Sequence, residues 1–169
     1  MFEDEEPDEF EAIRSTPIYL KGMEICTLAL EIADVIESSL EKQSSEDSQM
    51  FGSGMVNMLR ENAFIIPAKI AGAHVPLYDL KMENAALIRK AARELQATTS
   101  GIRMIMPDTD TDYLQLLRDH IEEFRVIFAE WVKTFDPFEY IIDRWGLFNP
   151  PGVNYDDPDP DRDILFDKD

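Results

Sequence analysis

The sequence predicts an all-α protein, an antiparallel up-and-down four-helix bundle with a short C-terminal helix and acidic tails. Four segments repeat apolar residues at alternating spacings of three and four, which is the period of an amphipathic helix. Polar or proline-containing stretches separate these segments, and no alternating strand pattern competes with them. We therefore expect three parts: an acidic leader (1–14), the bundle with its short final helix (15–146) and an acidic, proline-rich tail (147–169).

The first two helices are predicted on either side of a polar link. The first begins at Pro17, because proline suits the first turn of a helix and the Thr16 hydroxyl can cap it. A polar, aperiodic run at 41–48 separates it from the second helix, which begins near Ser48. Pro67 lies inside the second helix, where it removes a backbone donor and clashes with the preceding turn. We therefore expect a kink at this point rather than a break.

The remaining helices follow the same apolar rhythm. The third helix is predicted at 77–106. The segment Pro107–Asp112 ends it and caps the fourth helix, which has the bulkiest apolar stripe and ends at Pro137. Beyond it, residues 138–146 have the pattern of a short amphipathic helix with a glycine stop.

The charge is the strongest functional indication in the composition. Sixteen Lys and Arg residues stand against 35 Asp and Glu residues, which gives a formal net charge of −19. Such a protein repels nucleic-acid phosphates and anionic membranes, so the charge argues against both and favours a basic protein partner. The start of the chain has no signal-peptide pattern, and no stretch approaches about 18 apolar residues. We therefore expect a cytoplasmic protein without a membrane contact.

The sequence has few residues of the types that usually form catalytic or metal-binding sites. His74 and His120 are the only histidines, and neither belongs to the Glu-x-x-His pairs of a di-metal bundle. The sequence has no glycine-rich phosphate loop, no Gly-x-Ser-x-Gly elbow and no Cys–His pairing for nucleophilic catalysis. The single cysteine, Cys26, has no partner for an internal disulfide and has the surroundings of a buried hydrophobic residue. We expect no enzyme, no cofactor and no metal, with a His120–Glu123 metal site as the alternative.

The second helix carries a recognisable run at Ile65–Ala73, in which Ile66, Pro67, Ala68, Ile70 and Ala71 follow the pattern Ser-Ile-Pro-x-Asn-Ile-Ala-Glu-Gly. Over residues 17–135 the chain resembles the bacterial four-helix bundle proteins first noticed as products of intervening sequences in large-subunit ribosomal RNA genes. Their relatives include accessory proteins of diversity-generating retroelements. Lys69 and Gly72–Ala73 depart from the pattern. The resemblance implies a noncatalytic homo-oligomer, pentameric in characterised relatives, which in the retroelement branch engages nucleic acid and a reverse transcriptase through a basic surface.

Pro67 and Asn84 are predicted to form a structural contact between the second and third helices. A helical hairpin that turns near 75–76 places Asn84 opposite Pro67. The Asn84 side chain would then donate to the carbonyl of Ala63, which the proline leaves without its intrahelical partner. The alternative is that Asn84 faces a wet interface.

Arg89, Lys90 and Arg93, with Arg103 further along, form the main cationic concentration on a helix. Because guanidinium and ammonium groups bind anions, the first three residues are a candidate anion-binding site. The alternative is that they pair with local carboxylates such as Glu94.

Aromatic residues at the end of the fourth helix and after it exceed what one helix face needs. Trp131, Phe135 and Trp145 are therefore candidates for a subunit interface, with Trp145 first, because interface centres are rich in aromatic residues. The tail contains one apolar triplet, Ile164–Phe166, which is either a docking peptide or a segment that packs on its own bundle.

These observations predict a noncatalytic, oligomeric helical scaffold or adaptor that binds another macromolecule. The alternative is an accessory protein for nucleic acid or a reverse transcriptase, which the resemblance favours and the acidic charge opposes. Gathering of the three cationic side chains on one positive surface would favour this alternative.

Overall fold

The computed structural model describes residues 9–42, 45–108 and 110–160, and every regular element in these ranges is an α-helix. The five helices are α1 (Glu9–Arg14), α2 (Pro17–Leu40), α3 (Glu46–Gly72), α4 (Tyr78–Ile105) and α5 (Thr111–Val132). The all-α prediction is confirmed. None of these helices is long and apolar enough to cross a membrane. Residues 1–8 of the predicted leader and the triplet Ile164–Phe166 lie outside the described residues.

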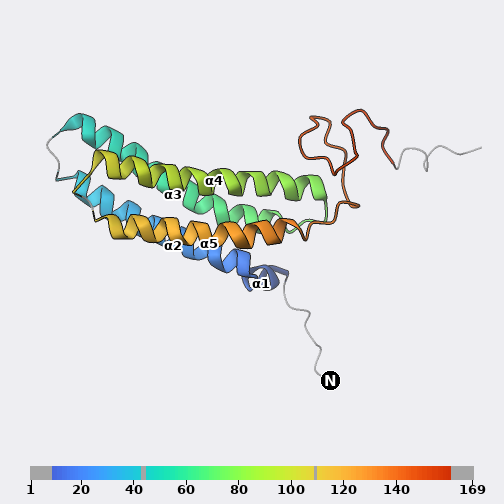
Figure 1. Cartoon of the computed structure of the whole chain (residues 1–169), viewed down its shortest axis with the longest axis horizontal. Coiled ribbons are helices and arrows are strands. Elements are labelled where there is room, and N and C mark those ends of the chain that lie inside the picture. Colours follow the sequence, from blue (N-terminus) through green and yellow to red (C-terminus); the bar gives the residue numbers. More distant parts are fainter. Residues whose placement is uncertain (1–8, 43–44, 109, 161–169) are drawn as a thin grey trace, which may run out of the picture.

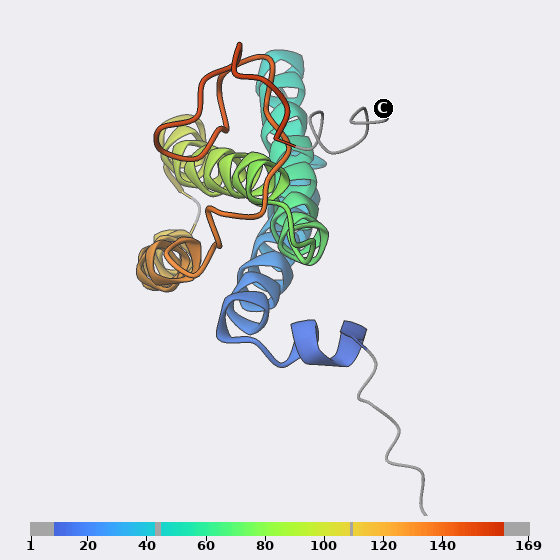
Figure 2. The same cartoon turned by 90° about the vertical axis from the view of Figure 1, so that its right-hand side faces the viewer.

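The long helices α2 to α5 lie side by side as a bundle (Figure 1). Helix α2 packs against α3 and α5, and α4 packs against the same two helices. Figure 2 shows the bundle nearly end-on, with α4 and α5 on one side and α2 and α3 on the other. Their apolar stripes meet in one core, whose largest fully buried side chains include Phe124, Ile25, Ile36, Leu59, Ile66, Ile88, Leu95 and Leu117.

Side-chain caps set where the helices begin. The Thr16 hydroxyl accepts a hydrogen bond from the Tyr19 N–H at 3.4 Å, so α2 starts at Pro17 as predicted. Helix α3 starts two residues earlier than predicted, because Ser45 rather than Ser48 is the capping residue. Helix α3 then runs unbroken through the buried Pro67.

Gly52 allows α2 and α3 to approach closely near the link between them. A Cβ atom at Gly52 would overlap the buried side chain of Leu40, whereas a Cβ at Gly54 would meet nothing within 4 Å. A glycine inside a helix costs about 1 kcal/mol relative to alanine. At Gly52 the close packing of α2 and α3 therefore offsets the cost of glycine's low helix propensity. Gly54 has no such packing role.

The short helix predicted at 138–146 is absent. The Asp143 carboxylate instead accepts hydrogen bonds from the N–H groups of Trp145, Leu147 and Phe148, which fold the chain into a turn. Gly146 lies within this turn and has a φ of 72°, a conformation that favours glycine. Such side-chain bonds to the backbone compete with helix formation.

The beginning of the predicted tail folds back on this turn. The Arg144 guanidinium donates to the carbonyls of Tyr155 and Asp157 and to the Asp159 carboxylate, at 2.7 to 2.8 Å. The Tyr78 N–H at the start of α4 also donates to the Glu139 carbonyl at 2.7 Å. These bonds hold an irregular segment beside the end of the bundle where α4 begins (Figure 1). At the other terminus, Glu9–Arg14 of the predicted leader forms α1.

Candidate functional site

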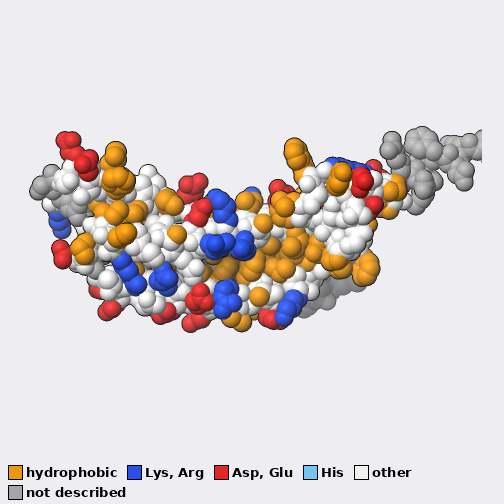
Figure 3. Space-filling view, turned by 45° about the horizontal axis from the view of Figure 1, so that its top comes forward, with side chains coloured by type: hydrophobic (Ala, Val, Ile, Leu, Met, Phe, Trp, Pro, Cys, Tyr) orange, Lys and Arg blue, Asp and Glu red, His pale blue; other side chains and the backbone are white. Residues whose placement is uncertain are grey.

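A groove of about 340 Å³ runs between α4 and α5. Its walls are mostly apolar, with arginines along the edges, and comprise Arg89, Ala92, Arg93, Gln96, Ile121, Phe124, Arg125, Phe128, Ala129 and Val132. Figure 3 shows Lys and Arg side chains gathered beside a hollowed hydrophobic area on this face. The groove combines an apolar floor with a cationic rim.

The groove exists because large and small side chains face each other across the two helices. Helix α5 contributes Phe124 and Phe128, whose ring centroids lie 6.1 Å apart. Ala92 from α4 and Ala129 from α5 fill little of the space beside these rings. Phe128 is therefore partly exposed in the floor, whereas Phe124 and most of the apolar stripe of α5 are buried against α2 and the rest of the core.

Polar bonds fix the spacing of α4 and α5 at one end of the groove. The Arg118 guanidinium donates to the Gln96 carbonyl at 3.0 Å and to the Thr99 hydroxyl at 3.1 Å. The Gln96 side-chain amide donates in turn to Glu122 at 3.0 Å. The hydrogen bonds from Arg125 and Gln96 lower the pKa of Glu122, so this carboxylate stays charged at neutral pH.

The rim contains two arginines without a carboxylate partner. Arg89 and Arg93 are exposed, and in the described part of the chain neither forms an ion pair or a side-chain hydrogen bond. Arg125 lies opposite them on α5 and pairs with Glu122 at 2.9 Å, both being exposed. Lys90 does not line the groove and pairs with Glu94 at 2.9 Å. The predicted cationic cluster is thus divided. Arg89 and Arg93 border the groove, whereas Lys90 pairs with a local carboxylate, as the alternative prediction had it.

Arg125 is the charged residue of the groove that the sequence analysis does not identify. It lies 32 positions after Arg93, beside a glutamate that pairs with it one turn away. Only the packing of α5 on α4 brings it to the groove. Three guanidinium groups then flank one apolar floor, an arrangement that suits carboxylate or phosphate groups attached to an apolar body.

The three predicted interface aromatics have different environments. Phe135 is buried, with 6% of its surface exposed, and Trp131 packs edge-on against it at a centroid distance of 4.7 Å. The Lys81 ammonium lies 5.5 Å from the Phe135 ring centroid. These two aromatics extend the core of the chain itself. Trp145, by contrast, is 96% exposed on the Asp143 turn.

Asn84 does not bond to the carbonyl beside Pro67. Its side-chain amide donates to the Leu80 carbonyl of its own helix at 2.8 Å and more weakly to the Gly72 carbonyl at 3.4 Å. The predicted contact is wrong although the chain does bend at 75–76: α3 ends at Gly72, and the Asn84 amide reaches this last residue of α3 instead of the turn that contains Pro67. Asn84 therefore links the two helices at their connection rather than at the proline.

His120 and Glu123 both accept hydrogen bonds from the ammonium group of Lys21. The Lys21 ammonium from α2 donates to Glu24 at 2.9 Å, to the His120 Nδ1 at 2.7 Å and to Glu123. Burial lowers the pKa of Lys21, but the hydrogen bonds to Glu123 and Glu24 outweigh it and the net direction is upward. Among the described residues, no group of three or more His, Cys, Asp or Glu side chains is arranged to hold a metal.

Comparison with known proteins adds no assignment to this geometry. Neither a protein-family model, nor a curated protein, nor a solved structure matches the chain.

Proposed function

We propose that the protein is a noncatalytic adaptor, built on an antiparallel up-and-down four-helix bundle of α2 to α5, which binds an acidic segment of another protein in the α4–α5 groove. One observation carries this proposal: Arg89 and Arg93 have no ion-pair partner in the described chain although it is strongly acidic, and they border an apolar floor. The net charge predicts a basic partner, but the local charge of the groove is positive. The groove and the rest of the surface therefore favour different partners.

The dimensions of the groove indicate the form of the partner segment. Its floor on α5 extends from Ile121 to Val132. Eleven steps of about 1.5 Å along a helix give a length of about 16 Å, which is three helical turns. An amphipathic helix with apolar residues at i, i+3 or i+4 and i+7 fits this length. Asp or Glu residues at its edges would pair with Arg89, Arg93 and Arg125.

We further propose that the protein is a cytoplasmic homo-oligomer and a divergent relative of the intervening-sequence bundle family. The Ile65–Ala73 run supports the family, and the exposed side chains of Phe138, Trp145 and Leu147 support a subunit contact. Large aromatic residues on an ordered surface are typical anchors of protein interfaces. Light scattering at two salt concentrations tests this assembly, since a monomer at both would contradict it.

A designed peptide tests the groove. The probe is a fluorescein-labelled 14-residue amphipathic helix with leucine at the three apolar positions and glutamate beside them, and the control is a scrambled peptide of the same composition. We expect Arg89→Ala and Arg93→Ala each to weaken binding by about 1 kcal/mol, or about fivefold. Lys90→Ala is the matched control, because it removes a neighbouring positive charge outside the groove.

A blocking variant tests the apolar floor separately. Ala129 is exposed and lines the groove, so Ala129→Trp should occupy the floor and abolish peptide binding while the fold, checked by circular dichroism, is retained. Equal losses in the Lys90→Ala and Arg93→Ala variants, or unchanged binding to Ala129→Trp, would exclude the groove as the binding site.

The alternative function, binding of nucleic acid, is favoured by the same three guanidinium groups. The acidic remainder of the chain opposes it. Titration with a labelled single strand and a labelled duplex at 50 and 200 mM salt separates the two functions. Salt-sensitive binding that is lost in Arg93→Ala would replace the adaptor proposal with the nucleic-acid one.

A further inference from the structure

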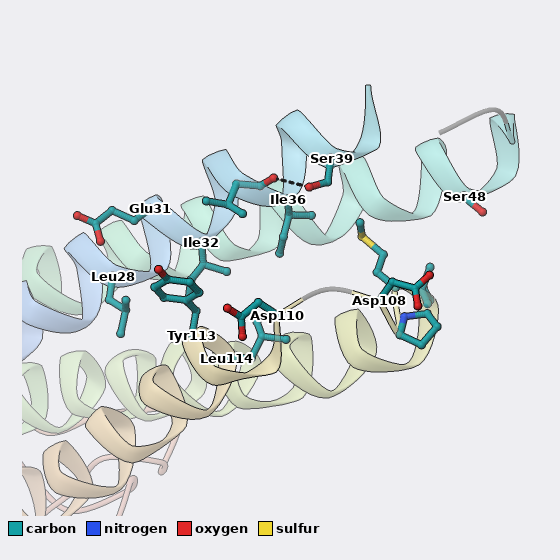
Figure 4. Close-up of a pocket in the computed structure, with 14 residues that line it drawn as sticks. Leu28, Glu31, Ile32, Ile36, Ser39, Ser48, Asp108, Asp110, Tyr113 and Leu114 are labelled. Carbon is teal, nitrogen blue, oxygen red and sulfur yellow. Dashed lines mark hydrogen bonds between the residues drawn. The ribbon is translucent and has the colours of Figure 1, made fainter. Parts of the chain in front are cut away.

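A second and larger cavity, of about 640 Å³, lies at the end of the bundle away from the irregular C-terminal segment. The second half of α2 forms one wall, and the segment from Ile105 to Leu114, apart from residue 109, forms the other. Figure 4 shows Ile32 and Ile36 of α2 on one side of the opening and Asp110, Tyr113 and Leu114 on the other. The cavity shares no lining residue with the α4–α5 groove.

Most of the side chains that line this cavity are apolar. Its lining includes Leu28, Ile32, Val35, Ile36, Met106, Pro107 and Leu114. Val35 and Tyr113 expose 56% and 55% of their surfaces, so apolar area is open to solvent at the mouth. A volume between about 300 and 1,000 Å³ with apolar walls and a few polar groups is typical of a site for a small molecule.

The charged groups around the cavity are all acidic. They are Glu31, Asp108 and Asp110, and no Lys, Arg or His residue is among the described residues that line the cavity. Asp110 uses one carboxylate oxygen to cap α5 through the Asp112 N–H at 2.9 Å. The side chains of Glu31 and Asp108 have no hydrogen bond or ion pair within the described ranges. Uncompensated carboxylates beside low-dielectric walls concentrate a negative potential at the cavity mouth.

Helix α2 provides an internal comparison. Its residues Asp34 and Glu37 lie outside the cavity, and Arg60 donates to them at 2.8 and 2.6 Å. That guanidinium lowers the pKa of Glu37. Glu31, one turn earlier and beside the cavity, has no such partner. Within α2, Glu31 at the cavity is therefore the carboxylate that no Lys or Arg of the described chain compensates.

We propose that this cavity binds a small amphipathic amine, with its apolar body between α2 and α5 and its protonated nitrogen at the mouth, in the combined negative potential of Glu31, Asp108 and Asp110. An ammonium or guanidinium group complements the carboxylates, and the apolar body replaces water on the isoleucine and leucine side chains. A bare metal ion does not suit the site, because the described carboxylates do not converge as a set of metal ligands. This inference goes beyond the adaptor function and uses a different surface.

Three eight-carbon probes of different charge test the proposal: n-octylamine, 1-octanol and octanoate. We expect octylamine to bind more tightly than octanol, and octanoate not to bind here. In a protein with labelled isoleucine and leucine methyl groups, octylamine should shift the NMR signals of Ile32, Ile36 and Leu114. The signals of Leu59 and Ile66, which are buried elsewhere in the core, should stay unchanged.

Carboxamide variants test the role of charge. Glu31→Gln and Asp108→Asn should each weaken octylamine binding about fivefold, which corresponds to one charge pair near the protein surface. Asp34→Asn is the matched control, because it removes the same charge from α2 on the side that faces Arg60. Octanol binding should be the same in all these variants, which also shows that the cavity is intact.

Several results would overturn the proposal. Equal affinities for octylamine and octanol would show that the carboxylates take no part in recognition. An effect of Asp34→Asn as large as that of Glu31→Gln would show a nonspecific charge effect. A lysine-containing peptide that shifts the Ile32 and Ile36 signals, while octylamine does not, would assign the cavity to a basic protein partner instead of a small amine.

Discussion

Replacing Gly52 and Gly54 by alanine in turn provides a sharp test of the packing between α2 and α3. Both glycines lie in α3, where alanine is favoured over glycine by about 1 kcal/mol in the interior of a helix. Gly54 has open space around it, so Gly54→Ala should stabilise the protein by about that amount. At Gly52 the new methyl group would overlap Leu40, and overpacking of this kind costs about 1–3 kcal/mol.

The two variants should therefore differ by about 1–3 kcal/mol in free energy of unfolding, with Gly52→Ala the less stable. Urea denaturation followed by circular dichroism measures this difference. With an m value of about 2 kcal/mol/M, a gap of 2 kcal/mol separates the midpoints by about 1 M. Equal stabilisation by both substitutions would show that α2 and α3 do not approach each other closely at Leu40.

A double-mutant cycle identifies the atoms responsible. Leu40→Ala removes the side chain that the new methyl group would overlap, at a cost of about 2–5 kcal/mol. In that background Gly52→Ala should become stabilising, because only the propensity gain remains. The coupling free energy should then be about 1–3 kcal/mol, whereas Gly54→Ala should show no coupling to Leu40. A coupling near zero for Gly52 would refute the steric explanation.

Two further predictions concern the turn at Asp143 and the contact of Asn84. The hydrogen bonds from the Phe148, Trp145 and Leu147 N–H groups lower the pKa of Asp143 in the folded protein. The charged carboxylate should therefore stabilise the turn fully at a pH above the unfolded-state pKa. This stabilisation should be lost as the pH falls through the folded-state pKa. The protection factors of these three amides, each relative to the intrinsic exchange rate at that pH, should fall on acidification, and in Asp143→Asn they should be low even at neutral pH; pH-independent protection factors would contradict this cause. Asn84→Leu should cost less than about 1 kcal/mol in urea denaturation, because one of its bonds lies within its own helix and the bond to Gly72 is long. A larger loss would show that Asn84 fixes the register of α3 and α4.

The helices could be predicted because their signals are local. Thr16 and Pro17 mark the start of α2 within two adjacent positions, and the apolar period of each helix is visible in its own sequence. The register between helices is not local. The turn near 75–76 is predicted correctly, but the contact of Asn84 also depends on how the two helices rotate and on where the side chain reaches, and the amide bonds to Gly72 instead of the turn that contains Pro67.

The turn after α5 shows a second reason why structure could not be predicted from the sequence pattern alone. Residues 138–146 have an apolar period that suits a helix, but the same sequence contains Asp143, whose carboxylate can satisfy three backbone N–H groups in a turn. Periodicity does not measure that competition. The pairing of the Glu139 carbonyl with the Tyr78 N–H, 61 positions away, further favours the irregular conformation, and no local pattern reveals it.

The two candidate sites have a common structural origin in α5. Its large side chains, among them Phe124 and Phe128, pack mainly toward α2 and the core, and the alanine-rich face of α4 leaves the groove on one side of them. At its beginning α5 leaves the larger cavity beside α2, because Asp110 and Tyr113 lie at the surface there instead of filling the space. The sequence then gives the two openings opposite charges: arginines border the groove, and carboxylates border the cavity. The two openings of one bundle therefore present opposite local charges, which the net charge of the whole chain does not predict.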